Sequence, residues 1–158
     1  MKKSFISFFI VLFIFISCKK EVNPSEEIML SEDKVVLTQA QRFCYQGIVK
    51  NDTINLKFEI DSNQVVKGDL AYFYFEKDKN EGTITGRMIG DTLKATYNFI
   101  SEGTESAREV VFLKKGKIMI EAYGDTEQIV NKTIFKDSKK LFFDSVTVLS
   151  ELDCVEAK

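Results

Sequence analysis

Residues 83–99 read TITGRMIGDTLKATYNF, and this stretch decides the fold class of the 158-residue chain. In its second half, the apolar side chains fall on one face of an extended strand: Leu93, Ala95, Tyr97 and Phe99. Such period-two alternation is typical of antiparallel strands that bury one face. Gly90-Asp91 separates this run from the run before it, and that dipeptide favours a tight turn. The stretch therefore predicts a β-hairpin.

The same alternation continues on both sides of the hairpin. Strands are expected near residues 44–50, 53–61, 64–76, 82–89, 92–101, 107–115, 117–123 and 140–149. Residues 125–139 are less regular, which predicts a loop or an extra short strand there. Short connections favour up-and-down order, and about eight strands are enough to close a small barrel. The sequence thus predicts an all-β, antiparallel up-and-down barrel, with a two-sheet β-sandwich as the alternative.

The start of the chain has the pattern of a secretion signal. Two lysines at positions 2–3 precede a run over residues 8–16 that contains no polar residue. The run has about the length of a signal-peptide core and roughly half the length that a bilayer-crossing helix needs. The small residue Ser17 and then Cys18 follow it.

The stretch IFISCKKE, residues 14–21, resembles the lipobox of bacterial lipoproteins and its relaxed form in Bacteroidetes, although Phe15 stands where the family usually has Leu, Val or Ile. The resemblance implies loss of residues 1–17 and a diacylglycerol on Cys18, which anchors the protein to a membrane. Lys19 replaces the aspartate associated with inner-membrane retention. The outer membrane of a Gram-negative bacterium is therefore expected, and its periplasmic and surface faces both stay open. The alternative is an ordinary secreted protein with a chance cysteine.

Beyond the signal, the chain divides into a tether and a domain. Residues 18–42 form a lipidated tether, in which Ser31 is a candidate N-cap for a short helix at 31–42. Residues 43–158 form the barrel domain.

Cys44 and Cys154 stand near the two ends of this domain. In an oxidising envelope compartment, two remaining cysteines are expected to form a disulfide. Barrel closure supports the pairing because it places the first strand beside the last. Two free thiols are the alternative, and the absence of CxxC spacing disfavours a metal or redox pair.

The missing residue types exclude several functions. The chain has no histidine, which removes Ser–His and Cys–His nucleophile systems and histidine-based zinc sites. With 22 basic and 24 acidic residues, it lacks the basic excess that nucleic-acid binding needs. Neither a glycine-rich phosphate loop nor a calcium-binding loop is evident. We therefore expect no cofactor, no metal and no catalytic residue in a protein that is not an enzyme.

Four residues form a candidate cluster for a ligand or a partner. Arg108 shares its strand parity with apolar residues, and Glu76 does the same in the strand expected at 64–76. If those faces point inward, an arginine and a glutamate enter the barrel near its rim, with Glu102 and Glu105 close by. An Arg–carboxylate pair can bind a polar ligand through two hydrogen bonds. The alternative is that these side chains are solvated or form a structural salt bridge.

Short motifs of Asp, then Thr or Ser, then an aliphatic residue resemble the acceptor of Bacteroidetes O-glycosylation. The resemblance implies glycosylation at Thr53, Thr92 and Ser145. An Asp that ends a turn before a strand explains the same pattern without glycosylation.

Longer segments also resemble known families. CYQGIV, FEKDKNEGTITG, GDTLKATYNFISEG and SAREVVF look like a family of flavobacterial envelope lipoproteins, over most of residues 44–154. That resemblance implies an envelope location and no particular activity. The strand plan is similar to calycin-type barrels, which bind small ligands. SEGTESAREVVFLKKGK, residues 101–117, resembles the lipoprotein inhibitors of c-type lysozyme, and differs from them by Glu102 between Ser101 and Gly103.

The expected function is that of a lipid-anchored envelope protein that binds a small ligand or an envelope or extracellular protein. Two alternatives stay open. One is a lysozyme- or hydrolase-inhibitor-like lipoprotein that acts through residues 101–116. The other is an enzyme that uses the carboxylates Glu76, Glu102 and Glu109.

Overall fold

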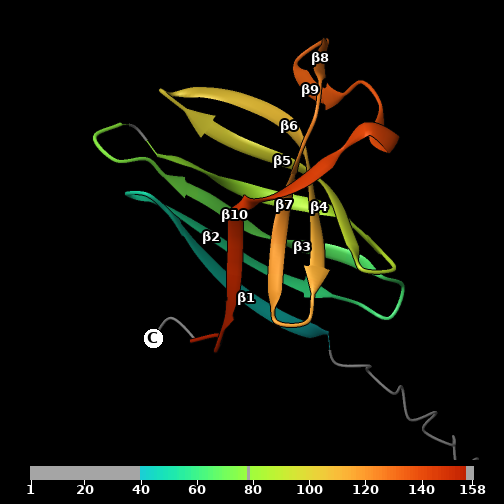
Figure 1. Cartoon of the computed structure of the whole chain (residues 1–158). Helices are drawn as coiled ribbons and strands as arrows, with labels where there is room; N and C mark the ends of the chain where they lie inside the picture. The colour runs from blue at the N-terminus through green and yellow to red at the C-terminus, as the bar shows by residue number, and fades with distance from the viewer. Residues whose placement is uncertain (1–39, 78, 156–158) are drawn as a thin grey trace, which may run out of the picture. The chain divides into compact units, whose positions relative to one another are not determined.

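The computed structural model describes residues 40–77 and 79–155, and within them the strands form a closed antiparallel barrel (Figure 1). The eight barrel strands are β1 (Gln41–Val49), β2 (Asp52–Ile60), β3 (Val65–Phe73), β4 (Asn80–Ile89), β5 (Thr92–Ser101), β6 (Thr104–Lys115), β7 (Ile118–Tyr123) and β10 (Phe142–Leu152). Each pairs with the strand next to it in this order, and β10 returns to pair with β1. The up-and-down barrel predicted from the sequence is confirmed.

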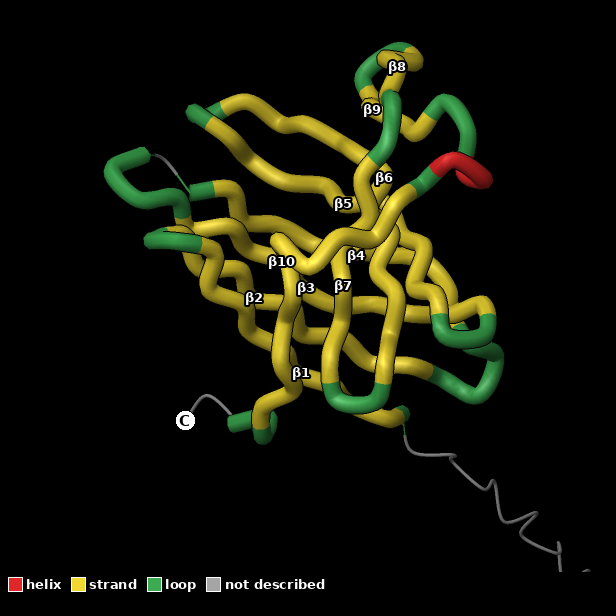
Figure 2. The backbone as a smooth tube through the Cα atoms, viewed as in Figure 1, coloured by secondary structure: helices red, strands yellow, loops and turns green. Residues whose placement is uncertain are grey.

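A short insertion interrupts the meander between β7 and β10. It contains β8 (Thr126–Ile129), β9 (Lys132–Phe135) and the 3-10 helix η1 (Ser138–Lys140), which is the red segment in Figure 2. β8 and β9 form a hairpin, and β9 pairs parallel with β6. The irregular segment 125–139 thus holds two short strands rather than one. Its turn has Val130 in the left-handed region (φ 57°), where the sequence offers no glycine to indicate a hairpin.

The barrel has two ends that differ in the chain segments they carry. The terminal end holds Gln41, the last residues of β10 and the β2–β3, β4–β5 and β6–β7 turns. The loop end holds the β1–β2 turn, the β3–β4 loop, the β5–β6 turn and the β8–β9 insertion. The barrel therefore begins and finishes at the same end.

Large side chains fill the barrel interior. Its fully buried members include Tyr45, Phe58, Leu93, Tyr97, Phe112, Met119 and Leu149. The strands come close together to achieve this packing. A Cβ atom on Gly82 of β4 would lie 1.9 Å from the carbonyl oxygen of Asn98 on β5, so only glycine fits there.

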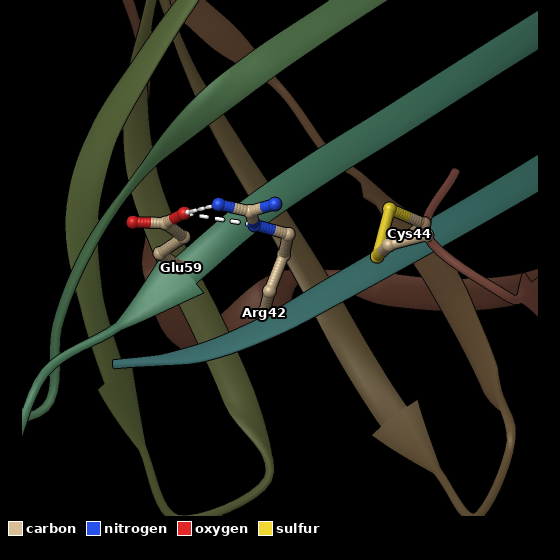
Figure 3. The surroundings of a disulfide bond; sticks show 4 residues. Arg42, Cys44 and Glu59 are labelled. Atoms are coloured by element: carbon tan, nitrogen blue, oxygen red, sulfur yellow. Dashed lines mark hydrogen bonds and ion pairs between the residues drawn. A yellow bond between two sulfur atoms is a disulfide. The ribbon is translucent and has the colours of Figure 1, made fainter. Parts of the chain in front are cut away.

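A disulfide between Cys44 and Cys154 closes the terminal end (Figure 3). Their Cα atoms lie 5.4 Å apart, and the bond joins β1 to the segment that follows β10. On the neighbouring strands, Arg42 faces Glu59, and the guanidinium donates to the carboxylate through Nε at 2.9 Å. The predicted disulfide is confirmed, and the alternative of two free thiols is wrong.

Several predictions concern the first 39 residues, which lie outside the described part of the chain. These are the signal peptide, Cys18 and most of the helix expected at 31–42. Only the last residues of that helix fall in the described part, and Gln41 and Arg42 are extended in β1. No helix in residues 40–77 and 79–155 has the length and apolar character needed to cross a bilayer.

Candidate functional site

A small polar pocket of about 250 Å³ lies at the loop end of the barrel. It is lined by Val49, Asp52, Thr53, Ile54, Tyr72, Tyr74, Arg108, Glu121, Tyr123, Val146 and Thr147. These residues come from β1, β2, β3, β6, β7 and β10 and from the residue just after β3. The pocket is thus formed where several barrel strands end.

An irregularity in β10 accompanies the pocket. The pairing of β10 with β7 shifts register between Phe143 and Val148, and Val146 lies inside that irregular stretch. On its other side, β10 pairs with only three residues of β1, from Cys44 to Gln46. The two strands are therefore held together near the terminal end and are unpaired where Val49 and Val146 line the pocket.

Arg108 is the central residue of the pocket. It lies on the inward face of β6, and its guanidinium stands over the ring of Tyr72 at 4.7 Å from the centroid, with Tyr97 at 5.6 Å and Phe99 at 5.9 Å. Stacking on aromatic faces holds the plane of a guanidinium in place. The side chain keeps 32% of its surface exposed, and it lines the pocket.

The hydrogen-bonding capacity of Arg108 is unused. Its one ion pair is a contact of 3.8 Å from Nη2 to Oε1 of Glu121, which is too long for a hydrogen bond. Its buried Nε has no hydrogen-bond partner within residues 40–77 and 79–155. Among the described residues, the hydroxyl of Tyr45 is the other buried side-chain polar atom without a hydrogen-bond partner, but Tyr45 does not line the pocket. A guanidinium carries five N–H donors, so Arg108 has donors left for a ligand.

Glu121 of β7 is the buried carboxylate of the site, with 9% of its side chain exposed. The hydroxyl of Tyr72 donates to its Oε1 at 2.6 Å. Burial raises the pKa of Glu121, and this effect outweighs the lowering by the Tyr72 hydrogen bond and by Arg108. The carboxylate is therefore held less firmly in its charged form than an exposed glutamate.

Three tyrosines form part of the remaining wall. Burial raises the pKa of Tyr72, Tyr74 and Tyr123, so their hydroxyls stay protonated at neutral pH. The hydroxyls of Tyr123 and Thr147 are hydrogen-bonded to each other. The pocket thus combines a cation, two carboxylates and several hydroxyl groups with aromatic faces.

The structure separates the four residues of the predicted cluster. Arg108 points inward, in agreement with its parity. Glu76 lies in the turn after β3 with φ 54°, so strand parity does not apply to it. It lines a shallow rim groove together with Glu102, whereas Glu105 lines another groove beside Glu81. Of the four predicted residues, only Arg108 lines the pocket.

The predicted cluster missed both carboxylates of the pocket, Asp52 and Glu121, and Glu121 is the more buried of the two. The run IMIEAY is apolar on both faces, and Glu121 shares its parity with the fully buried Met119. Ile120 and Ala122 are also buried, but they lie outside the interior core cluster. A charged residue within a doubly apolar strand is the signal that could have indicated this position.

Glu109 points away from the pocket, on the outer face of β6. Its carboxylate pairs with Lys94 at 3.0 Å and accepts a hydrogen bond from the backbone of Phe135 at 3.1 Å. The contact with Phe135 holds β9 against the barrel, and the contact with Lys94 joins β6 to β5. Glu109 does not line the groove that Glu76 and Glu102 share.

The candidate glycosylation residues lie at three different places. Thr53 is half-buried at the start of β2, where it lines the pocket. Thr92 is half-buried at the first position of β5, and Ser145 is exposed in the irregular stretch of β10. Ser145 therefore offers the most accessible hydroxyl of the three.

The fold and the pocket define the class of the protein as a closed eight-stranded antiparallel barrel with a polar pocket at one end. No family model, curated protein or solved structure matches the chain. Within residues 40–77 and 79–155, no group of acidic or cysteine side chains has an arrangement that could hold a metal ion.

Proposed function

We propose that this chain is a lipid-anchored envelope protein that binds a small polar ligand in the pocket at the loop end. The observation that carries the proposal is Arg108, which is inward-facing, stacked on aromatic rings and without a hydrogen bond from its Nε. Buried polar groups in proteins are almost always satisfied, and an exception calls for an explanation. A ligand that supplies the missing acceptors is such an explanation.

The rest of the barrel supports a pocket of limited size. Its interior is filled by apolar side chains, so a ligand would be accommodated near the loop end only. Binding sites commonly combine an apolar wall with a few polar groups that fix orientation. Val49, Ile54 and Val146 would supply the wall, and Arg108 and Glu121 the polar groups.

The proposal is tested by screening small polar compounds against the purified full chain in detergent. Amide chemical shifts report the site of binding, and shifts confined to residues such as Thr53 and Thr147 are expected. The five tyrosines provide a second readout, since the chain has no tryptophan to mask their fluorescence. A screen in which every compound leaves the pocket resonances unmoved contradicts the proposed function.

The proposed anchor is tested separately. We expect Cys18→Ala to move the protein from the membrane fraction to the soluble fraction, because the lipid would no longer be attached. Cys154→Ala provides the control, since it removes a cysteine of the barrel and leaves Cys18 in place. Membrane retention of the Cys18→Ala protein would count against lipidation.

One observation favours the inhibitor alternative. The turn of the β5–β6 hairpin lies at the loop end. In β5, Ile100 is 56% exposed and lies between Glu81 of β4 and Glu105 of β6. An exposed apolar residue with acidic neighbours suits contact with a basic protein such as a lysozyme. An assay of c-type lysozyme with the purified chain tests this alternative, and undiminished lysozyme activity would dispose of it.

A further inference from the structure

We infer that the ligand of the pocket is a compact zwitterion of the amino-acid class, whose carboxylate pairs with Arg108. This inference rests on the proposed function, because it names the chemistry of a ligand for the same pocket. It follows from the unused donors of Arg108, the charges that surround them and the size of the cavity.

The first requirement is a planar acceptor. A guanidinium presents its N–H groups in a fixed fork that matches the two oxygens of a carboxylate. Arg108 is held over the ring of Tyr72, and its Nη2 lies 3.8 Å from Glu121, so no carboxylate of the described chain occupies the fork at hydrogen-bond distance. A ligand carboxylate would complete this arrangement.

The second requirement is a positive group on the same ligand. Asp52 and Glu121 line the cavity together with Arg108, so a ligand with only negative charge would face two carboxylates. A phosphate group, with its higher charge, would be repelled more strongly than a carboxylate. An ammonium group on the ligand removes this repulsion and can bind to the acidic side chains.

The acidic side chains are positioned to receive such a group. Asp52 is fixed at the start of β2, because its Oδ1 accepts a hydrogen bond from the backbone of Phe75 at 2.8 Å. Asp52, Glu121 and Arg108 all line this one cavity of about 250 Å³. One small molecule in the cavity therefore lies beside both signs of charge.

The third requirement is small size. The cavity holds about 250 Å³, which is below the range of roughly 300–1,000 Å³ that is usual for drug-sized ligands. Val49, Ile54 and Val146 give it an apolar side that can accept a short side chain. A free amino acid combines this size with a carboxylate, an ammonium group and an apolar portion.

The test compares three sets of probes against the wild-type full chain by calorimetry and tyrosine fluorescence. The sets are free L-amino acids, the corresponding amino-acid amides, and the corresponding carboxylic acids without the amino group. We expect at least one amino acid to bind. Its amide and its acid analogue should each bind at least about tenfold more weakly, because each loses a charged hydrogen-bonded contact.

Two arginine variants add a matched comparison. Arg108→Lys keeps the charge but loses the fork, and should weaken amino-acid binding at least about tenfold. Arg87→Lys changes an exposed arginine whose Nη2 donates to the backbone of Asn63, far from the lining of the pocket, and should leave binding unchanged.

The outcomes separate the ligand class from the proposed function. If the amide or the acid analogue binds as tightly as the amino acid, or if inorganic phosphate displaces it, the zwitterion is wrong while ligand binding in the pocket stands. If neutral polar compounds bind in the pocket and amino acids do not, the same conclusion holds. If no compound of the three sets binds, the zwitterion is overturned. The proposed function is overturned as well only if the wider screen of polar compounds leaves the pocket resonances unmoved. These comparisons use wild-type protein, so they hold even where a variant fails to fold.

Discussion

The two ends of the barrel are built from the same strands but differ in what fills them. At the terminal end, the disulfide joins β1 to the residues after β10, and apolar side chains such as Phe58, Leu93 and Met119 fill the interior. At the loop end, the interior contains Arg108 and Glu121, and a cavity remains. A filled, disulfide-linked end that supports a polar end is the arrangement expected when a binding site must be held in place.

Two Arg–Glu pairs make the same comparison in detail. The exposed pair, Arg42 and Glu59, has contacts of 2.8 and 2.9 Å from the guanidinium to one carboxylate oxygen. In the buried pair, Arg108 and Glu121, the closest contact is 3.8 Å. A buried ion pair needs good geometry to offset the cost of removing its charges from water. The buried pair lacks that geometry, so it should stabilise the fold less than a closely hydrogen-bonded buried pair would.

Loss of the disulfide should have the largest effect, and it acts at the terminal end. The bond closes a loop with a sequence separation of 110 residues. In the chain-entropy model, the Cys44→Ser/Cys154→Ser protein should lose about 4–5 kcal/mol of unfolding free energy, measured by urea denaturation. A reducing agent should lower the stability of the wild type by a similar amount and leave the double variant unchanged. Equal stability of both proteins would show that the terminal end does not depend on this bond.

Truncation of a core ring at the terminal end should follow closely in size. Phe58 is fully buried and stacks near Phe43 and Tyr45, at centroid distances of 5.4 and 6.0 Å. Phe58→Ala should cost about 3–5 kcal/mol of unfolding free energy, because it leaves a cavity in a packed interior. Tyr74→Ala is the matched change at the loop end, and a clearly smaller loss is expected because Tyr74 already borders a cavity. Equal losses of unfolding free energy at the two positions would contradict the difference in packing between the two ends.

The sequence predicts the barrel well because most strands bury one face only. In β2, the alternation places Ile54, Leu56 and Phe58 inside, and all three are buried there. The same rule is insufficient in β7, since Ile120 and Ala122 are buried without belonging to the interior cluster. Period-two reasoning cannot tell which face points inward when both are covered.

The site is harder to predict than the fold because it depends on where strands end. Parity placed Arg108 correctly, since it lies within β6. It failed for Glu76, because β3 ends at Phe73 and the chain turns before reaching that residue. The partner Glu121 is 13 positions from Arg108 and on another strand, and the β6–β7 register that relates them is a tertiary feature. Boundaries and register are the features that local patterns specify least.

A smaller effect is expected in the pH dependence of stability, and it acts at the loop end. The pKa of Glu121 is raised above its ordinary value of 4.5, chiefly by burial. The folded protein therefore holds this proton more tightly than the unfolded chain. Its contribution to stability is complete below pH 4.5 and is lost as the pH rises through the higher folded-state value.

Glu121→Gln tests this contribution because glutamine cannot titrate but can still accept the hydrogen bond from Tyr72. The wild type should lose stability relative to Glu121→Gln as the pH is raised from 4.5 to neutral, in urea denaturation at several pH values. The control is Glu59→Gln, which removes an exposed carboxylate. This protein should still lose stability as the pH rises, because Glu121 is intact. Parallel pH profiles of the unfolding free energy for wild type and Glu121→Gln would show that the titration of Glu121 does not affect stability.

The smallest effect is expected for the exposed pair, despite its shorter contacts. Arg42 and Glu59 keep 41% and 47% of their side chains exposed, so water and salt screen their attraction. A double-mutant cycle with Arg42→Ala and Glu59→Ala should give a coupling energy of about 0.2–1 kcal/mol that falls as salt is added. The equivalent cycle with Arg108→Ala and Glu121→Ala should respond less to salt, because that pair is more buried. A larger coupling energy for the exposed pair at high salt would show that contact distance matters more than burial. The unused donors of Arg108 would then no longer support a binding site.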